Sequence, residues 1–155
     1  MKAFRSLMTK MLKPELRILI LFLLVIFSLQ MAFAQSHSLS LTVEGIEDVK
    51  GIMQIGLFND SEDFLETGSE YRIASVPVDS VIVIVVFDSL PKGNYSISLY
   101  HDLDTSGSIN KNFIGIPTEP WGISNDAWRL LSAPRWKEAV FSLDTDKTIV
   151  IHLRD

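Results

Sequence analysis

The sequence predicts an all-β domain, an antiparallel β-sandwich of about seven strands that carries one long structured loop. Two observations support this fold class. Short segments rich in Val, Ile and Leu recur over residues 39–153, with turn-forming residues between them. No long segment of that stretch shows the 3.6-residue apolar spacing of a helix. About seven short strands in one domain of this length are typical of a sandwich.

The expected strands alternate apolar and polar residues or form an unbroken apolar run. They cover residues 39–43, 52–58, 71–78, 81–87, 95–100, 140–143 and 148–153. Pro77 restricts the third strand to an edge or a strand end, because proline cannot donate to a neighbouring strand. Residues 90–94 are expected to form a turn, and residues 144–147 the turn of a hairpin between the last two strands.

Three further segments are expected to lie outside the strands. The acidic stretch 59–69 is predicted to be a loop or a short helical turn. Residues 125–130 are expected to form a helical turn with Ser124 as its cap, and residues 135–139 another after Pro134.

The strand at residues 81–87 has apolar side chains at seven successive positions. Such a strand presents apolar groups on both faces of its sheet, whereas a sandwich strand needs only one apolar face. We expect a central strand whose outer face lies beneath the long loop of residues 102–136. The alternative is a surface for a partner, such as a second copy of the chain in a homodimer.

The first 34 residues are predicted to be a secretory signal peptide. The basic residues of this segment are Lys2, Arg5, Lys10, Lys13 and Arg17. An apolar run follows at residues 18–27, and Ala32 and Ala34 form an A-x-A site before Gln35. The alternative is a membrane anchor, but the run is shorter than the roughly 20 residues that span a bilayer.

Cleavage after Ala34 would leave a single domain, residues 35–155. We expect an exported protein that does not span a membrane after cleavage and that is periplasmic, on the outer surface or in the medium. The removed segment holds five of the 14 Lys and Arg residues and one of the 19 Asp and Glu residues. Nine basic and 18 acidic residues remain, a formal net charge of −9.

The charge and composition of the domain exclude some partners. An acidic surface is unsuited to nucleic acid, since phosphate binding needs a basic one, but it attracts divalent cations. The chain has no cysteine, so no disulfide stabilises it and no lipid can be attached to a processed cysteine. Its stability must come from a hydrophobic core, helped by any ion that it binds.

A loop that begins at Asp102 has the composition of a calcium site. Oxygen-bearing side chains occupy alternate positions around Gly107, as in loops that wrap a hard cation. The predicted metal ligands are Asp102, Asp104, Ser106, Ser108, Asn110 and, from further along the chain, Glu119. Phe113 stands where an EF-hand has its bidentate acid, and the loop follows a strand, so the site is not an EF-hand.

The affinity expected for this loop is low. Only two of its own ligands are charged, which suggests a calcium Kd of roughly 10⁻⁴–10⁻³ M, as in extracellular modules. The alternative is a polar turn without a metal, stabilised by hydrogen bonds of its Asp, Asn and Ser side chains. Calcium is the one cofactor that the sequence suggests.

Four motifs resemble a secreted bacterial family known as domain of unknown function 2141. The motifs are the LPKGNY turn at 90–95, HD at 101–102 with the loop that follows, FIGIPTEPWGISN at 113–125, and the closing residues Pro134, Trp136, Ala139 and Phe141. Leu103, Ser106 and Asn110 replace residues that are acids or better ligands in the family pattern, which weakens the calcium interpretation. The LPKGNY turn is also similar to that of prealbumin-like modules, so the resemblance implies an immunoglobulin-like or prealbumin-like sandwich of unknown activity.

The segment 115–125 has two interpretations. Its glycines and prolines give it a fixed path, and Trp121, Ser124, Asn125 and Trp128 could form a surface for a sugar or peptide. The partner would then be an extracellular protein or a glycan. The other interpretation, which we favour, is a small core in which Phe113 and the three tryptophans hold the long loop against the sheet.

Enzyme activity is not expected. His101 beside Asp102 allows acid–base chemistry, but its place at a strand end favours a structural role. The GISND stretch at 122–126 lacks the second glycine of a nucleophile elbow, and no zinc motif occurs. The sequence therefore suggests an exported, non-catalytic β-sandwich module with a binding or envelope-associated role.

Overall fold

The computed structural model describes residues 13–32, 36–130 and 132–154. The chain divides into two compact units, and the second begins at Ser36. The first unit contains one helix, α2 (Pro14–Ala32). Pro14 and Glu15 suit its first turn, because proline has no N–H to leave unpaired there and an acid complements the helix dipole. Of the helices described, none is both long and apolar enough to cross a membrane. Lys2, Arg5 and Lys10, and the predicted cleavage site at 33–35, lie outside the described residues.

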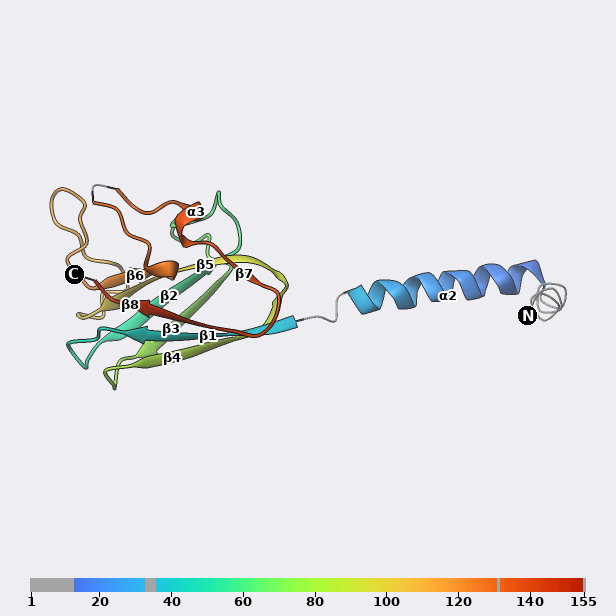
Figure 1. The fold of residues 1–155 in the computed structure, drawn as a ribbon, viewed down its shortest axis with the longest axis horizontal. Coiled ribbons are helices and arrows are strands. Elements are labelled where there is room, and N and C mark those ends of the chain that lie inside the picture. The colour runs from blue at the N-terminus through green and yellow to red at the C-terminus, as the bar shows by residue number, and fades with distance from the viewer. Residues whose placement is uncertain (1–12, 33–35, 131, 155) are drawn as a thin grey trace. The chain divides into compact units, whose positions relative to one another are not determined.

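The second unit is a β-sandwich of eight strands among the residues described, which confirms the predicted fold class (Figure 1). Its elements are β1 (Ser36–Glu44), β2 (Ile52–Phe58), β3 (Arg72–Pro77), β4 (Val83–Pro91), β5 (Gly93–Asp102), β6 (Trp121–Ile123), η1 (Ser124–Asp126), α3 (Trp136–Ala139), β7 (Phe141–Leu143) and β8 (Lys147–His152). One sheet has the order β4-β1-β8, the other β3-β2-β5-β6, and β7 pairs with the first residues of β5.

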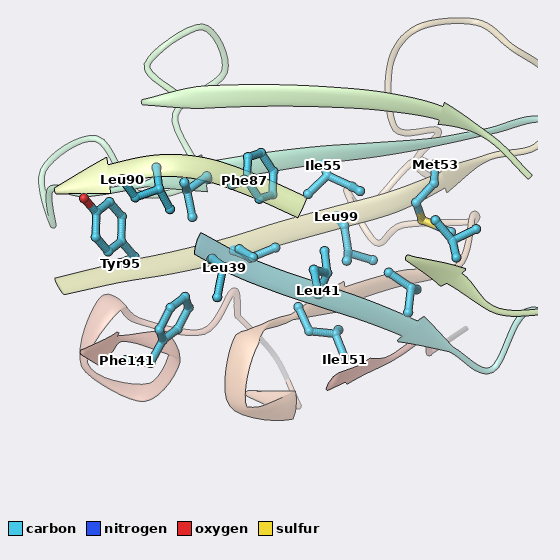
Figure 2. Close-up of a cluster of buried hydrophobic side chains, with 14 of the residues drawn as sticks. Leu39, Leu41, Met53, Ile55, Phe87, Leu90, Tyr95, Leu99, Phe141 and Ile151 are labelled. Atoms are coloured by element: carbon cyan, nitrogen blue, oxygen red, sulfur yellow. The ribbon is translucent and has the colours of Figure 1, made fainter. Parts of the chain in front are cut away.

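The core lies between the two sheets, and the described residues that form it fall between 39 and 153. β1 contributes Leu39, Leu41 and Val43, at alternate positions, and each side chain is fully buried. Figure 2 shows Leu39 and Leu41 of β1 among Ile55, Leu99 and other apolar side chains of the remaining strands. Because the unit that begins at Ser36 has a hydrophobic core of its own, it meets the usual condition for a domain that folds by itself.

The last two strands do not form the expected hairpin. β7 pairs with β5 in the larger sheet, whereas β8 lies parallel to β1 in the smaller sheet. The turn between them therefore carries the chain from one sheet to the other. Asp146 in this turn accepts a hydrogen bond from the backbone N–H of Ser38 (2.8 Å), at the start of β1. The sandwich thus contains one parallel pair among antiparallel ones.

The expectation that residues 81–87 form a central, covered strand is wrong. β4 is an edge strand of the three-stranded sheet, and the side chains of Val81, Ile82, Ile84 and Val86 are exposed. The long loop cannot cover them, because it leaves β5 and returns to β6 within the other sheet. By contrast, the prediction for Pro77 is confirmed, since it ends the edge strand β3.

The aromatic core expected beneath the long loop does not form as a whole. Phe113 is 99% exposed and Trp128 53% exposed, while Trp121 is half-buried. Of the tryptophans, Trp136 packs edge-on against Phe64, with ring centroids 5.7 Å apart.

The two expected helical turns exist in shorter form. The first is the 3₁₀ turn η1 alone; Ser124 is its first residue rather than its cap, and Ala127 is already extended. The second is α3, which follows Arg135; the backbone N–H of Arg135 donates to the Glu138 carboxylate (2.8 Å).

Candidate cation site at the end of strand β5

Three carboxylates meet where β5 ends and the long loop begins. Asp102 is the last residue of β5, Asp104 follows two residues later, and Glu119 lies two residues before β6. One oxygen of each side chain lies within 4.8 Å of those of the other two. Asp102 and Glu119 are buried, whereas Asp104 is exposed. Glu119, 15 residues further along the chain than Asp104, is brought to the loop because β6 pairs with β5.

Backbone N–H groups hold the two buried carboxylates in place. The two oxygens of Asp102 accept hydrogen bonds from Ser106 (3.0 Å) and Gly107 (2.9 Å). The two oxygens of Glu119 accept from Leu103 (3.0 Å) and Asn110 (2.8 Å). The loop is therefore folded around its acids, as the metal-free alternative also requires. Each carboxylate oxygen has a second lone pair and can still accept from a donor or bind a cation.

No lysine or arginine within the described parts of the chain forms a salt bridge with Asp102, Asp104 or Glu119. The negative charge of these acids also affects the pKa of a neighbouring tyrosine. Burial raises the pKa of Tyr100, and the negative charges of Asp102 and Glu119 raise it further. The pKa of Asp104 is lowered, chiefly by a hydrogen bond from the Asn110 amide and then by bonds from Ser106. The acids thus form a concentrated negative site.

The remaining predicted ligands surround this cluster in different ways. The Asn110 amide nitrogen donates to Asp104 (2.9 Å), so a half-turn of that amide would direct its oxygen to the same place. The hydroxyl hydrogen of Ser106 is donated to the backbone carbonyl of Ser108 (2.9 Å), within the loop itself. No hydrogen bond of the Ser108 hydroxyl is found among the described residues. Of the six predicted ligands, the structure brings Asp102, Asp104 and Glu119 together as the charged set.

One residue that supports this site, Gly51, escaped the sequence analysis, whereas His101 was expected to have a structural role at the end of its strand. Gly51 has φ +71°, and a methyl group on it would overlap the carbonyl oxygen of Asp102. His101 is buried, and its ring Nε2 lies 2.6 Å from the carbonyl oxygen of Lys50. Together they fix the β1–β2 loop against the end of β5. The one available signal for Gly51 was a glycine directly before an expected strand, and it does not reveal a contact with a residue 51 positions away.

The predicted ligand-binding residues have mixed environments. The Ser124 hydroxyl is buried; it accepts from the backbone N–H of Ile97 (3.0 Å) and donates to the carbonyl of Ala139 (2.6 Å). The Asn125 amide donates to the carbonyls of Glu138 (3.2 Å) and Val140 (3.0 Å). These two side chains connect β5, η1 and α3. Trp121 is half-buried in β6, which leaves Trp128 as the exposed aromatic of the group.

The fold defines an all-β sandwich domain. A family described as "Uncharacterized protein conserved in bacteria (DUF2141)" matches residues 41–151, which is most of the sandwich, and the chain belongs to this family. Neither the curated proteins nor the solved structures include a significant match.

Proposed function

We propose that this chain is an exported, non-catalytic β-sandwich module whose loop at 102–119 is ordered by calcium. Its place would be the bacterial envelope or the surrounding medium. The observation that carries the proposal is the cluster of Asp102, Asp104 and Glu119, with oxygens within 4.8 Å of one another. Three negative charges at this distance repel, and two of them are buried, so a divalent cation would relieve a substantial cost.

The chemistry of the donor set fits calcium. Carboxylate, amide and backbone carbonyl oxygens are the ligands that calcium prefers, and nitrogen or sulfur ligands are not part of the cluster. The three acids would supply the charge, and the amide oxygen of Asn110 would complete one side. Bound in this way, the ion would tie the end of β5 to the segment before β6.

Thermal melts with calcium, with magnesium and with a chelator test the ion site. If Kd is about 1 mM, tenfold excess calcium stabilises the fold by about 1.4 kcal/mol, a shift of several degrees. Asp104→Asn should remove this shift, whereas Asp79→Asn, which changes an exposed acid outside the cluster, should retain it. A shift of less than about one degree for the unaltered protein in 10 mM calcium would contradict the proposal.

A second candidate function is the binding of a glycan or peptide on aromatic side chains. The exposed ring of Trp128 favours it, since aromatic faces stack on sugar rings. Trp128→Ala should then abolish binding to a cell-wall or glycan array without changing the melting temperature. Trp121→Ala is a poor probe, because the Trp121 side chain is half-buried and losing it would also destabilise β6.

We also propose that a second copy of the chain is a partner, in a homodimer formed through β4. β4 is an edge strand of its sheet, and its side chains at 84 and 86 are exposed isoleucine and valine, with the exposed Ile82 directly before the strand. Natural edge strands of this length usually carry charges or are covered, because bare apolar edges pair with one another.

A further inference from the structure

A short, tightly bonded hairpin projects from the long loop at residues 110–118, here called the finger. Lys111 pairs with Pro117 across it, and the N–H of Thr118 donates to the carbonyl of Asn110 (2.8 Å). At its tip, the Asn112 side chain accepts hydrogen bonds from the N–H groups of Ile114 (3.1 Å) and Ile116 (3.0 Å). The finger therefore has a defined conformation.

This conformation holds three large apolar side chains in water. Phe113 is 99% exposed, Ile114 is 64% exposed, and Ile116 is exposed as well. Because internal hydrogen bonds maintain the tip, the exposure does not result from a loose loop that could collapse onto the sheet. Adjacent exposed apolar groups of this kind mark interaction sites in soluble domains.

A second apolar tip lies in the segment that follows η1. Trp128 and Leu130 are both exposed there. In the view of Figure 1, this segment and the finger project on the same side of the sandwich, near β6. The exposed aromatic and aliphatic groups of the long loop thus lie on two projecting segments.

The charge at both tips differs from that of the domain. Residues 110–118 contain one charged residue, Lys111, and residues 127–130 contain one, Arg129. Neither segment has an acid, although acids outnumber bases 18 to nine from residue 35 onward. Lys111 is exposed, while Arg129 also pairs with Glu138 (3.2 Å). Because Glu138 balances Arg129, the positive charge beside these apolar groups is that of Lys111 on the finger, and it is complementary to an anionic surface.

We propose that the finger, with Trp128 and Leu130, docks this domain on an anionic lipid surface. Aromatic and aliphatic side chains flanked by lysine or arginine are the pattern of segments that insert at the bilayer interface. A projecting tip can enter a fluid bilayer without a shape-matched partner, whereas a protein partner would need a cavity for Phe113.

The base of the finger is joined to the acidic cluster. The backbone N–H of Asn110 donates to Glu119 (2.8 Å), and its side chain donates to Asp104 (2.9 Å). In this respect the inference rests on the proposed function, because calcium at the cluster would fix the finger and lower the local negative charge. Calcium should therefore strengthen lipid binding.

Sedimentation of the domain 36–155 with vesicles tests the inference. We expect binding to vesicles of one part phosphatidylglycerol and three parts phosphatidylcholine in millimolar calcium, and weaker binding to phosphatidylcholine alone. Phe113→Ser should lower the partition coefficient at least tenfold, about 1.4 kcal/mol, since the phenyl ring would no longer be buried in the bilayer interface. Ile114→Ser should lower it by a smaller factor.

A matched control variant exists on another face. Ile73 on β3 is 65% exposed, close to the 64% of Ile114, so Ile73→Ser removes the same side chain at nearly the same exposure. It should leave the partition coefficient unchanged. All three variants should melt within a degree or two of the unaltered domain, because each replaced side chain is exposed.

Three results would overturn the inference: no binding to the anionic vesicles in calcium, full binding by Phe113→Ser, or an equal loss with Ile73→Ser. The calcium proposal is judged separately, from the melts. Finger-dependent binding that persists in chelator would support lipid docking and count against the role of calcium. A calcium-dependent melt without vesicle binding would retain the ion site and overturn the docking.

Discussion

The carboxylate of Asp126 accepts two hydrogen bonds from His152, one from the backbone N–H (2.9 Å) and one from the ring Nδ1 (2.7 Å). The other ring nitrogen, Nε2, lies 3.5 Å from the Glu44 carboxylate. This contact joins η1 to the end of β8 and, through Glu44, to β1. Asn125 and Asp126 both have left-handed backbones, with φ of 61° and 49°, so the contact helps to hold an otherwise unfavourable turn.

The His152–Asp126 pair makes stability depend on pH in two ways. The hydrogen bond to Asp126 raises the pKa of His152, so its contribution is present below the unfolded pKa of about 6.5 and is lost as pH rises through the folded value. For Asp126, burial alone would raise the pKa, but the hydrogen bonds from His152 lower it overall. Its contribution is therefore lost as pH falls through that lowered value.

An NMR titration of the imidazole checks the first effect. Asp126→Asn should lower the pKa of His152, because the charged acceptor is removed, and asparagine tolerates the left-handed backbone. Asp79→Asn, far from the histidine in sequence and not bonded to it, should leave that pKa unchanged. An unchanged pKa in Asp126→Asn would show that the hydrogen bond does not govern this histidine.

Gly51→Ala should destabilise the domain by roughly 2 kcal/mol or more, because a methyl group there meets the carbonyl of Asp102 and the backbone is left-handed. Gly68→Ala is the matched control. Gly68 is also left-handed, with φ +88°, but has open space around it. Urea unfolding should show a clearly larger loss at 51 than at 68, and equal losses would contradict the importance of the close contact.

Ser124→Ala should cost roughly 1–3 kcal/mol, since it leaves the backbone groups of Ile97 and Ala139 without their buried partner. Ser96 provides a contrast, because its buried hydroxyl has no hydrogen-bond partner among the described residues. Ser96→Ala should be neutral or stabilising in the same urea experiment. A similar cost for both variants would mean that cavity formation, not hydrogen bonding, determines the loss.

Self-association through β4 is tested at its outward positions. Val83 is buried in the core, so a lysine there would unfold the domain rather than probe the surface. Ile84→Lys and Val86→Lys should instead shift a dimer to the monomer in size-exclusion chromatography with light scattering. Ile73→Lys, at an exposed position on the other edge strand, β3, should not. A monomer at millimolar concentration before any substitution would exclude this dimer.

Several elements could be predicted because their signal is local. Residues 52–58 were expected as a strand with the bounds that β2 has, since apolar and polar residues alternate there. Asp102 and Asp104 could be assigned to one site because the loop between them is short. The approach of Glu119 was suggested only by its proximity in sequence.

Other features follow from contacts between distant segments. β6 has three residues and no strand signal of its own; it exists because it pairs with β5 at Ser98, Leu99 and Tyr100. Phe113 was expected to be buried, as large aromatics generally are, yet the hydrogen bonds of Asn112 hold it away from the sheet. Composition alone cannot reveal such a tip.

By itself, therefore, the sequence determined the sandwich, most of its strands and the acidic character of the loop after β5. These depend on alternation and composition, which act over a few residues. Only the tertiary structure decided that β8 runs parallel to β1, that β4 is an exposed edge, and that Glu119, Gly51 and His101 meet at Asp102. Each of these depends on which strands pair, and pairing is set by packing of the whole core rather than by any local pattern.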